Sequence, residues 1–465
     1  MSTKFVLPEA KTGGPRYRVL ADSICDAIQR GEISPGEKLP PVRDLAWNLG
    51  ISPGAVARAY KLGVERGALE AVVGRGTFAR TPDSAPVYAI DGLVADAPLG
   101  NIDLRGNEAV NVGQNVEIGQ ALARLLARHG GVPPITGYRQ RADDWDATEA
   151  LSGWLCTRSV PSVPERLLVT SGAQVGVVSV MSLLARGGGV VLTAPTAYPG
   201  VRDGAAAIGV RFEAVAADGQ GMLPEALDRA CTRNRPDAMQ ITATLQNPTL
   251  AIMDLPRRAA LVDVARRHGV PIIEDDVYGP LIDHPLPSFA QLAPELSWYV
   301  TSLSKCVAAG LRAGLVLTPP GRTIPTFRSY QALSQQTPWL VKALAGELVS
   351  GGEAAIIRDR VAAETRRRAA MAAEIIGPYG AVTHPAASFA YLPLPDPWSS
   401  AEFVAAAAGA GVLVPPDTIY KTLRGGPEFT RMALCGQVTM AELRDGLLRL
   451  ASILRDGPAA SAPVT

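Results

Sequence analysis

Apolar residues recur every three or four positions in the first part of the chain, which is the spacing of buried helix faces. Leu20, Ile24 and Ile28 lie four apart and predict one helix. Residues 42–49 repeat the spacing and predict a second helix. Ser52, an N-cap residue followed by a proline, begins a third. The pattern therefore predicts three short helices with only a few residues between the last two.

The next segment, ALEAVVGRGTFA, reads as two short strands around Gly74-Arg75-Gly76. Two strands joined by a glycine-containing turn predict a β-hairpin, here with a cation at its tip. Helices joined by a short turn and followed by a hairpin are typical of winged helix-turn-helix DNA-binding domains. A small helical dimerisation module with scattered surface arginines is the alternative interpretation.

From Leu167 onward, apolar strands and amphipathic helices alternate every 20 to 30 residues or so, which predicts an α/β fold with a mostly parallel sheet covered by helices on both faces. Ligands of such sheets bind outside the carboxyl ends of the strands. The predicted strands are LLVT, GVVLTAP, VRFEAV, AMQITAT, VPIIEDD, WYVTS and AGLVLT.

These patterns divide the chain into four parts. Residues 1–80 form the predicted DNA-binding domain, and residues 81–101, rich in proline, alanine and aspartate, form a linker. Residues 102–334 carry the predicted sheet. Residues 335–465 combine long arginine- and alanine-rich helices with short strands, which indicates a smaller α+β domain.

Charge is uneven along a chain whose 465 residues have a net charge of only +1. Residues 1–80 hold 12 Lys+Arg against 8 Asp+Glu, which leaves 33 against 36 for the rest, so only the N-terminal part suits a polyanion. We find no apolar run that could span a bilayer and no secretory layout, and we expect a cytoplasmic protein. The scattered cysteines and histidines predict no structural metal.

Lysine is rare, because 38 of the 45 basic residues are arginine. Lys305 is the only lysine between Lys61 and Lys342. An arginine cannot readily lose its proton, whereas a lysine can become a neutral nucleophile. Lys305 is therefore a candidate functional residue, with a plain surface lysine as the alternative.

Polar residues follow several of the predicted strands. Residues 171–174, Ser-Gly-Ala-Gln, open a helix whose free N–H groups suit a phosphate, and Asn247 lies in a turn after a strand. Asp275 ends a very apolar strand, where a carboxylate needs a cationic partner. With Tyr278 and Lys305, these groups provide the amine, carboxylate, phenol, amide and phosphate cup that pyridoxal 5′-phosphate (PLP) requires.

The run PGEKLPPVRDLAWNLGISPGAVARAYKLGVERGALEAVVGRGTFA resembles the winged-helix domain of GntR-family regulators. This resemblance implies that Arg43 binds a DNA phosphate and that Arg75 reaches the minor groove. It places Ser52, Arg58 and Lys61 at the major groove or its rim. The recognition helix begins Pro-Gly-Ala, which offers bases no side-chain hydrogen bond, so we expect sparse direct readout.

Residues 102–450 resemble fold-type I aminotransferases, with TSGAQ, APTAYPG, QNPT, EDDVY, TSLSK and FTRMAL in order. The resemblance implies that Lys305 forms a Schiff base with PLP and that Asp275 keeps the pyridine nitrogen protonated. Asp276 is the alternative, but only Asp275 lies three residues before Tyr278, as in that family.

The resemblance also assigns the remaining cofactor contacts. Asn247 and Tyr278 would bind the 3′-oxygen, Tyr198 would stack on the ring, and Arg431 would bind the carboxylate of an amino compound. Leu250 stands where the family usually has glycine. The phosphate would be held by Gly172, Ala173, Gln174, Ser302 and Arg312, with Tyr138 reaching the phosphate of a neighbouring subunit.

The two resemblances together identify the chain as similar to the MocR subfamily of GntR-type transcription regulators. They imply a PLP-dependent homodimer that binds operator DNA and senses an amino acid, an amine or PLP itself through Lys305. A working aminotransferase with an accessory DNA-binding domain is the alternative. A third interpretation is a cofactor-free regulator, against which the retained PLP-binding residues argue.

Overall fold

The structure is a computed structural model that describes residues 15–29, 33–34, 36–65, 68–72, 76–79, 100–131, 145–283, 285–422, 425–435 and 438–458. The chain divides into two compact units. The first contains residues 1–96 with residues 424–426, and the second contains the remainder.

The N-terminal unit has three helices and a hairpin. The helices are α1 (Arg16–Gln29), α2 (Val42–Leu49) and α3 (Pro53–Glu65), and β1 (Leu69–Val72) pairs antiparallel with β2 (Gly76–Ala79). The predicted apolar spacing forms its core, where Leu20, Ile24, Leu45 and Val56 are completely buried. Helix α2 ends at Gly50 in the left-handed conformation that glycine adopts readily.

The start of α3 is capped as the sequence predicts, because the Ala55 N–H donates to Ser52 Oγ over 3.2 Å. Ser52, Arg58 and Lys61 are exposed, and so is Arg43 in the first turn of α2. Arg75 lies outside the described residues.

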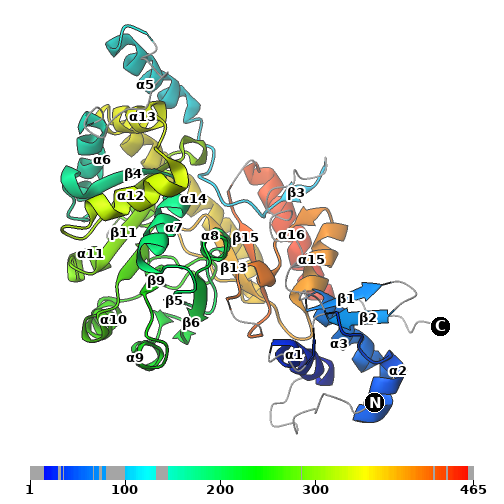
Figure 1. The fold of residues 1–465 in the computed structure, drawn as a ribbon. Coiled ribbons are helices and arrows are strands. Elements are labelled where there is room, and N and C mark those ends of the chain that lie inside the picture. The colour runs from blue at the N-terminus through cyan, green and yellow to red at the C-terminus, as the bar shows by residue number, and fades with distance from the viewer. Residues whose placement is uncertain are drawn as a thin grey trace. The chain divides into compact units, whose positions relative to one another are not determined.

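A seven-stranded mixed sheet forms the centre of the second unit (Figure 1). Its strand order is β4-β12-β11-β10-β9-β5-β6, and only β12 runs antiparallel to its neighbours. The expected α/β class is confirmed. The strands are β4 (Leu167–Ser171), β5 (Val190–Thr193), β6 (Arg211–Ala214), β9 (Ala238–Ile241), β10 (Ile272–Asp275), β11 (Ser297–Ser302) and β12 (Ala313–Leu317).

Helices cover both faces of this sheet, which explains why its strands are nearly continuous apolar runs. One face packs against α7 (Ala173–Leu184), α8 (Pro199–Ala207) and α12 (Thr323–Ser334). The other packs against α9 (Pro224–Asn234), α10 (Leu255–His268) and α11 (Phe289–Leu292). Helices α5 (Asn115–Arg128), α6 (Trp145–Thr157) and α13 (Trp339–Ser350) extend the core.

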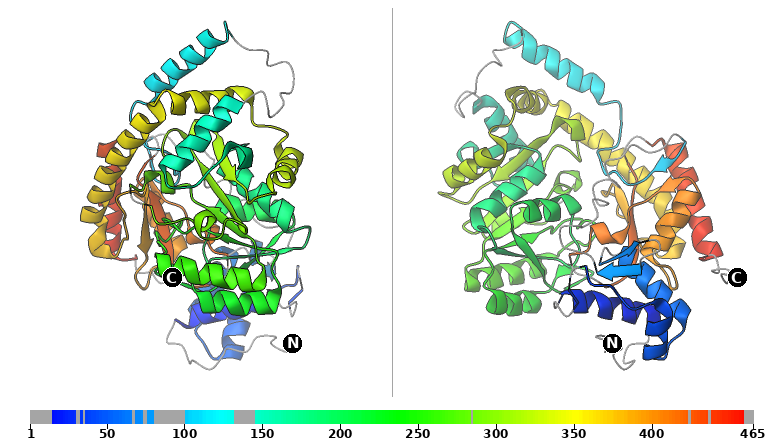
Figure 2. Two further views of the ribbon diagram at one scale, coloured as in Figure 1. Left: turned by 90° about the vertical axis from the view of Figure 1, so that its left-hand side faces the viewer. Right: turned by 45° about the vertical axis from the view of Figure 1, so that its right-hand side comes forward.

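A smaller two-stranded sheet, β13 (Phe389–Pro393) with β15 (Phe429–Ala433), packs against α15 (Ser400–Gly409) and α16 (Met440–Asp456). The long helix α14 (Glu353–Ile376) passes from the large sheet's helices to this small sheet (Figure 2). Two short strands, β3 (Ile102–Asp103) and β14 (Val412–Leu413), pair in parallel beside it. None of the helices among the described residues combines the length and apolarity needed to cross a membrane.

Candidate functional site

The phosphate cup predicted after β4 is built on a close approach of two residues. Gly172 has a φ of 92°, and a Cβ placed on it would lie 2.5 Å from Arg312 Nη2. The missing side chain therefore lets the guanidinium lie against the start of α7, whose first N–H groups have no partner within the helix. A helix N-terminus beside an exposed arginine is a ready anion site. Ala173 and Gln174 form the first turn of α7. Ser302 ends β11, which pairs with β12, the strand that begins directly after Arg312.

Asp275 lies at the end of β10 and is almost completely buried. Its Oδ1 has no hydrogen-bond partner among the described residues. The pKa of Asp275 is raised to about 7. Burial is the main cause, the adjacent Asp276 adds to the rise, and Lys305 opposes it. Asp276 also has an oxygen, Oδ1, without a partner among the described residues, but its Oδ2 is engaged because it accepts from the Tyr299 hydroxyl over 2.8 Å. The geometry thus favours Asp275 as the carboxylate that faces a ligand.

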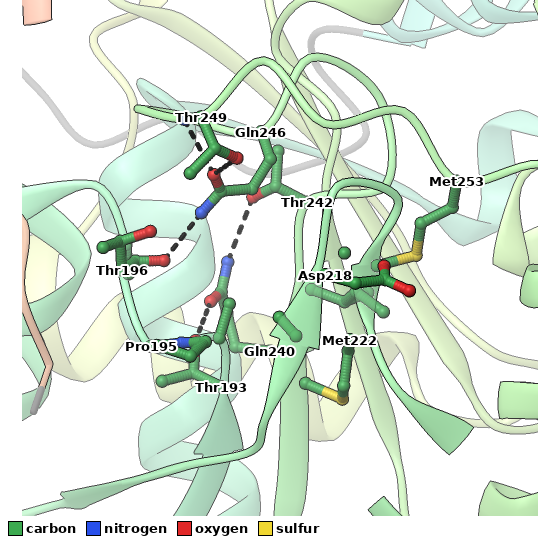
Figure 3. Close-up of a pocket in the computed structure, with 15 residues that line it drawn as sticks. Thr193, Pro195, Thr196, Asp218, Met222, Gln240, Thr242, Gln246, Thr249 and Met253 are labelled. Carbon is green, nitrogen blue, oxygen red and sulfur yellow. Dashed lines mark hydrogen bonds between the residues drawn. The ribbon is translucent and has the colours of Figure 1, made fainter. Parts of the chain in front are cut away.

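Asn247 lies in a turn that is held by its neighbour Gln246. The Gln246 amide donates to the Thr196 carbonyl over 2.6 Å, and its oxygen accepts from Thr249. Figure 3 shows this arrangement at the rim of a cavity of about 50 Å³ at the ends of β5 and β9. Leu250 closes the turn with a φ of 63°, a conformation that glycine adopts at lower cost and which explains the glycine expected there.

Asn247 Oδ1 is buried and has no partner among the described residues, so this turn presents a free acceptor. Tyr198 precedes α8 and its hydroxyl donates to Gln174 Oε1 over 3.3 Å. Burial raises the pKa of Tyr198, and the charge of Asp275 adds to this rise. The residue is still 40% exposed, so it is accessible to a ligand.

Lys305 follows β11 and is half-buried, with its Nζ donating to the Asn107 carbonyl. The pKa of Lys305 is lowered to about 8. Burial is the main cause, Cys435 opposes the fall, and the Arg431 guanidinium adds to it. A substantial fraction of the amine is therefore neutral and nucleophilic in mildly alkaline solution.

The Asn107 side chain connects three parts of this site. Its Nδ2 donates to the Tyr278 hydroxyl over 2.5 Å, and its Oδ1 accepts from Ser388 Oγ over 2.7 Å and from Cys435 Sγ over 3.3 Å. Tyr278 is completely surrounded, and burial raises its pKa far above the usual value. No periodicity or motif in the sequence marks Asn107, Ser388 or Cys435, so these residues are absent from the predicted site.

Arg431 lies on β15 and is 98% buried, since only 2% of its surface is exposed. Its guanidinium carbon lies 5.7 Å from the ring centre of Phe389 and 5.6 Å from that of Tyr420. The Nη2 atom of Arg431 donates to the Arg105 carbonyl, whereas its Nε and Nη1 have no partner among the described residues. A buried guanidinium with free donors is suited to a carboxylate. Tyr138 lies outside the described residues.

Comparison with known proteins agrees with this geometry. The family "Aminotransferase class I and II" matches residues 125–450, and "Bacterial regulatory proteins, gntR family" matches residues 16–79. The chain belongs to the aminotransferase class I and II family. It joins this aminotransferase domain to a GntR-family helix-turn-helix domain, so the expected membership of the MocR-type transcription regulators is confirmed.

Two curated relatives illustrate this MocR-type organisation. The uncharacterized HTH-type transcriptional regulator YdeF of Bacillus subtilis is 25% identical over 96% of both chains. The pyridoxine biosynthesis transcriptional regulator PdxR of Corynebacterium glutamicum is 26% identical over 71% of this chain and 72% of its own. Among solved structures, LysN, an α-aminoadipate aminotransferase from Thermus thermophilus, matches with a TM-score of 0.69 and 23% identity over 79% of this chain and 94% of its own. The last likeness concerns the fold.

Membership of the aminotransferase family implies PLP as the cofactor, and the residues of this MocR-type chain fit it. The buried atoms without a partner among the described residues include a carboxylate oxygen of Asp275, an amide oxygen of Asn247 and two guanidinium nitrogens of Arg431. Buried polar atoms are rarely left unpaired in folded proteins. A cationic ring nitrogen would be a suitable partner for Asp275, a ring hydroxyl for Asn247 and a carboxylate for Arg431.

Gly314 offers a test of the phosphate cup. A Cβ on Gly314 would lie 2.4 Å from the Gly172 carbonyl carbon, so Gly314→Ala must displace the cup's backbone, whereas Gly310 has nothing within 4 Å. We expect Gly314→Ala to lower the free energy of unfolding by about 1–3 kcal/mol and to weaken PLP binding, with Gly310→Ala close to wild type. Chemical denaturation and PLP titration measure the two effects. Equal behaviour of both variants would contradict this cup.

The lowered pKa of Lys305 predicts its reactivity. Only the neutral amine attacks an acylating reagent, so the rate at Lys305 should rise with pH and level off above its pKa of about 8. Mass spectrometry of the PLP-free protein follows this site individually. A midpoint near about 10.4, the value of lysine in an unstructured peptide, would show that the site does not depress the pKa.

Proposed function

We propose that this MocR-type regulator holds PLP on Lys305 and senses a small amino compound whose carboxylate binds Arg431. The observation that carries the proposal is the set of buried, unpartnered polar atoms around Lys305, on Asp275, Asn247 and Arg431. Pairing these atoms with a ligand removes a desolvation cost that the ligand-free protein bears.

Each residue has a role in binding that follows from its position. The start of α7 and Arg312 would hold the phosphate, Asp275 would pair with the ring nitrogen, and Asn247 would face the ring hydroxyl. Lys305 would hold the aldehyde carbon, and Tyr198 would cover the ring. When bound, PLP supplies an aldehyde that reacts with amines and a ring that withdraws electrons.

PLP itself is the second candidate for the effector. PdxR, whose name concerns pyridoxine biosynthesis, is one of the relatives that match this chain. On this version of the proposal, occupancy of the Lys305 site reports the supply of the cofactor. The effector is whichever of the two, an amino compound or PLP, binds two conformational states of the protein with different affinities. Only such a ligand shifts the populations of the two states.

The GntR-family domain implies DNA binding. We propose that the target is a duplex operator read by a cytoplasmic homodimer, in which two aminotransferase domains pair and present two reading heads. A two-fold symmetric protein suits two half-sites in repeated or inverted arrangement. Arg43, Ser52, Arg58 and Lys61 are exposed and therefore accessible to DNA, and Arg75 is proposed for the wing.

An active aminotransferase remains the competing function, because the groups that a half-reaction needs are present. Lys305, with its pKa near 8, could move a proton as a general base once it is released from the cofactor. Arg431 would hold the substrate carboxylate in either case.

The experiment that separates the two functions is a visible absorbance titration of the PLP-loaded protein with amino acids and amines, with a keto-acid assay on the same samples. We expect a band that one ligand shifts without release of keto acid, and loss of the band in Lys305→Ala. Catalytic formation of keto acid would favour the enzyme. A band that persists in Lys305→Ala would remove Lys305 from the proposal.

DNA binding gives an independent prediction. Arg43→Ala should weaken binding to a duplex selected from random sequences by the wild-type protein. It should flatten the salt dependence by about two units of log–log slope, because each of the two reading heads of the proposed dimer loses one phosphate contact. Fluorescence anisotropy at several salt concentrations measures both. Arg328→Ala, an exposed arginine of α12, is the matched control. Equal slopes in the two variants would exclude Arg43 from the interface.

A further inference from the structure

A short segment that follows β3 crosses the site, and we name residues 104–108 the strap. At its start, the Leu104 N–H donates to the Leu413 carbonyl over 2.9 Å, and the Leu104 carbonyl accepts from the Ala433 N–H over 2.8 Å. The strap is thus anchored between β14 and β15 of the small sheet region. Beyond Leu104 it reaches the residues that the proposed function uses.

Two backbone carbonyl groups of the strap accept hydrogen bonds from Arg431 and Lys305. The Arg105 carbonyl accepts a hydrogen bond from Arg431, and the Asn107 carbonyl accepts one from Lys305. Arg431 is the proposed carboxylate-binding residue and Lys305 is the proposed cofactor-binding residue. One segment therefore contacts both groups that a ligand would take over, although Nε and Nη1 of Arg431 have no partner among the described residues.

The Asn107 side chain locks the strap in this position. Its bonds to Tyr278 and Ser388 come from the large and the small part of the unit, respectively. Further along, the Glu108 N–H points at Cys435 Sγ over 3.3 Å. All of these contacts are non-covalent and can exchange for contacts with a ligand.

We infer that the strap is a built-in competitor of the effector: it occupies Lys305 and Arg431 in the ligand-free protein, and an amino carboxylate bound with PLP displaces it from both. The inference rests on the proposed function of these two residues. The strap leaves both functional groups only when its contacts with Lys305 and with Arg431 are both taken over, so the site responds to the cofactor and the carboxylate together.

This arrangement narrows the class of effector. The group that replaces the Arg105 carbonyl on a guanidinium must be a hydrogen-bond acceptor, and a charged carboxylate binds a guanidinium more strongly than a neutral carbonyl does. A simple amine has no such acceptor and leaves the Arg431 contact in place. Amino acids and related amino carboxylates are therefore the effectors that release the strap, rather than amines without an acid group.

Hydrogen exchange of the strap tests the lock in the ligand-free protein. Ser388→Ala removes one bond to Asn107, and Ser329→Ala is a matched control because its hydroxyl donates to the Ser179 carbonyl over the same distance, 2.7 Å. We expect peptides covering residues 104–108 to exchange up to about tenfold faster in Ser388→Ala and unchanged in Ser329→Ala. Equal exchange in the strap of both variants overturns the lock.

The ligand steps are tested on the wild-type protein with PLP, then with PLP plus L-alanine or ethylamine. We expect faster strap exchange with PLP, a further increase with L-alanine and none with ethylamine. A visible PLP band with unchanged strap exchange overturns the inference and leaves the proposed function standing. Equal responses to the two amines, including no response to either, overturn the carboxylate step.

The two proposals fail in different ways. Absence of any PLP band would refute the proposed function of Lys305, while the Ser388→Ala comparison, made without ligand, still decides whether the strap is locked through Asn107. Peptides from β11, which is completely buried, serve as the internal reference, since neither variant touches them.

Discussion

An unpaired carboxylate oxygen at the end of a buried strand is the constraint on which this site depends. Asp275 ends β10 because the strand before it is apolar enough to lie inside the sheet, and burial leaves its Oδ1 without a partner. Burial raises the pKa of this carboxyl to about 7 even with Lys305 opposing the rise, so the group is partly protonated near neutrality. A ligand that brings a positive charge keeps it ionised, so the fold creates a demand that a protonated ring nitrogen meets.

Close packing around two glycines positions the Arg312 guanidinium at the proposed phosphate-binding end of the site. The Arg312 guanidinium reaches the start of α7 only because Gly172 has no side chain, and Gly314 on the adjacent strand leaves room for the backbone of Gly172. Packing is equally close at Gly200, where a Cβ would lie 2.4 Å from Gln174 Oε1. The anion-binding end of the site is therefore set by backbone approach, and a methyl group is enough to disturb it.

These features differ in how far the sequence could predict them. Strand ends could be located from apolar runs, so Asp275, Asn247 and Lys305 were predicted at one edge of a sheet, and the structure brings them together. Asn107 and Ser388 could not be found in this way, because they are 281 positions apart and meet only through the fold. Arg75 and Tyr138 stay predictions, since they lie outside the described residues. Leu250 is an intermediate case, in which a departure from the expected glycine proved to have a left-handed conformation.

The groups proposed for a half-reaction are compatible with a sensor if one of them is held back. A lysine that leaves the cofactor can act as a base only while it is free to reach the bound ligand. The partner of Lys305 in the structure is the Asn107 carbonyl, which belongs to the strap. On the inference drawn above, the strap leaves Lys305 while the ligand is bound and returns when the ligand departs, so the lifetime of the bound state limits how long the amine is free to move a proton. The balance between sensing and catalysis in this chain then lies in the competition for one nitrogen atom rather than in the loss of any residue.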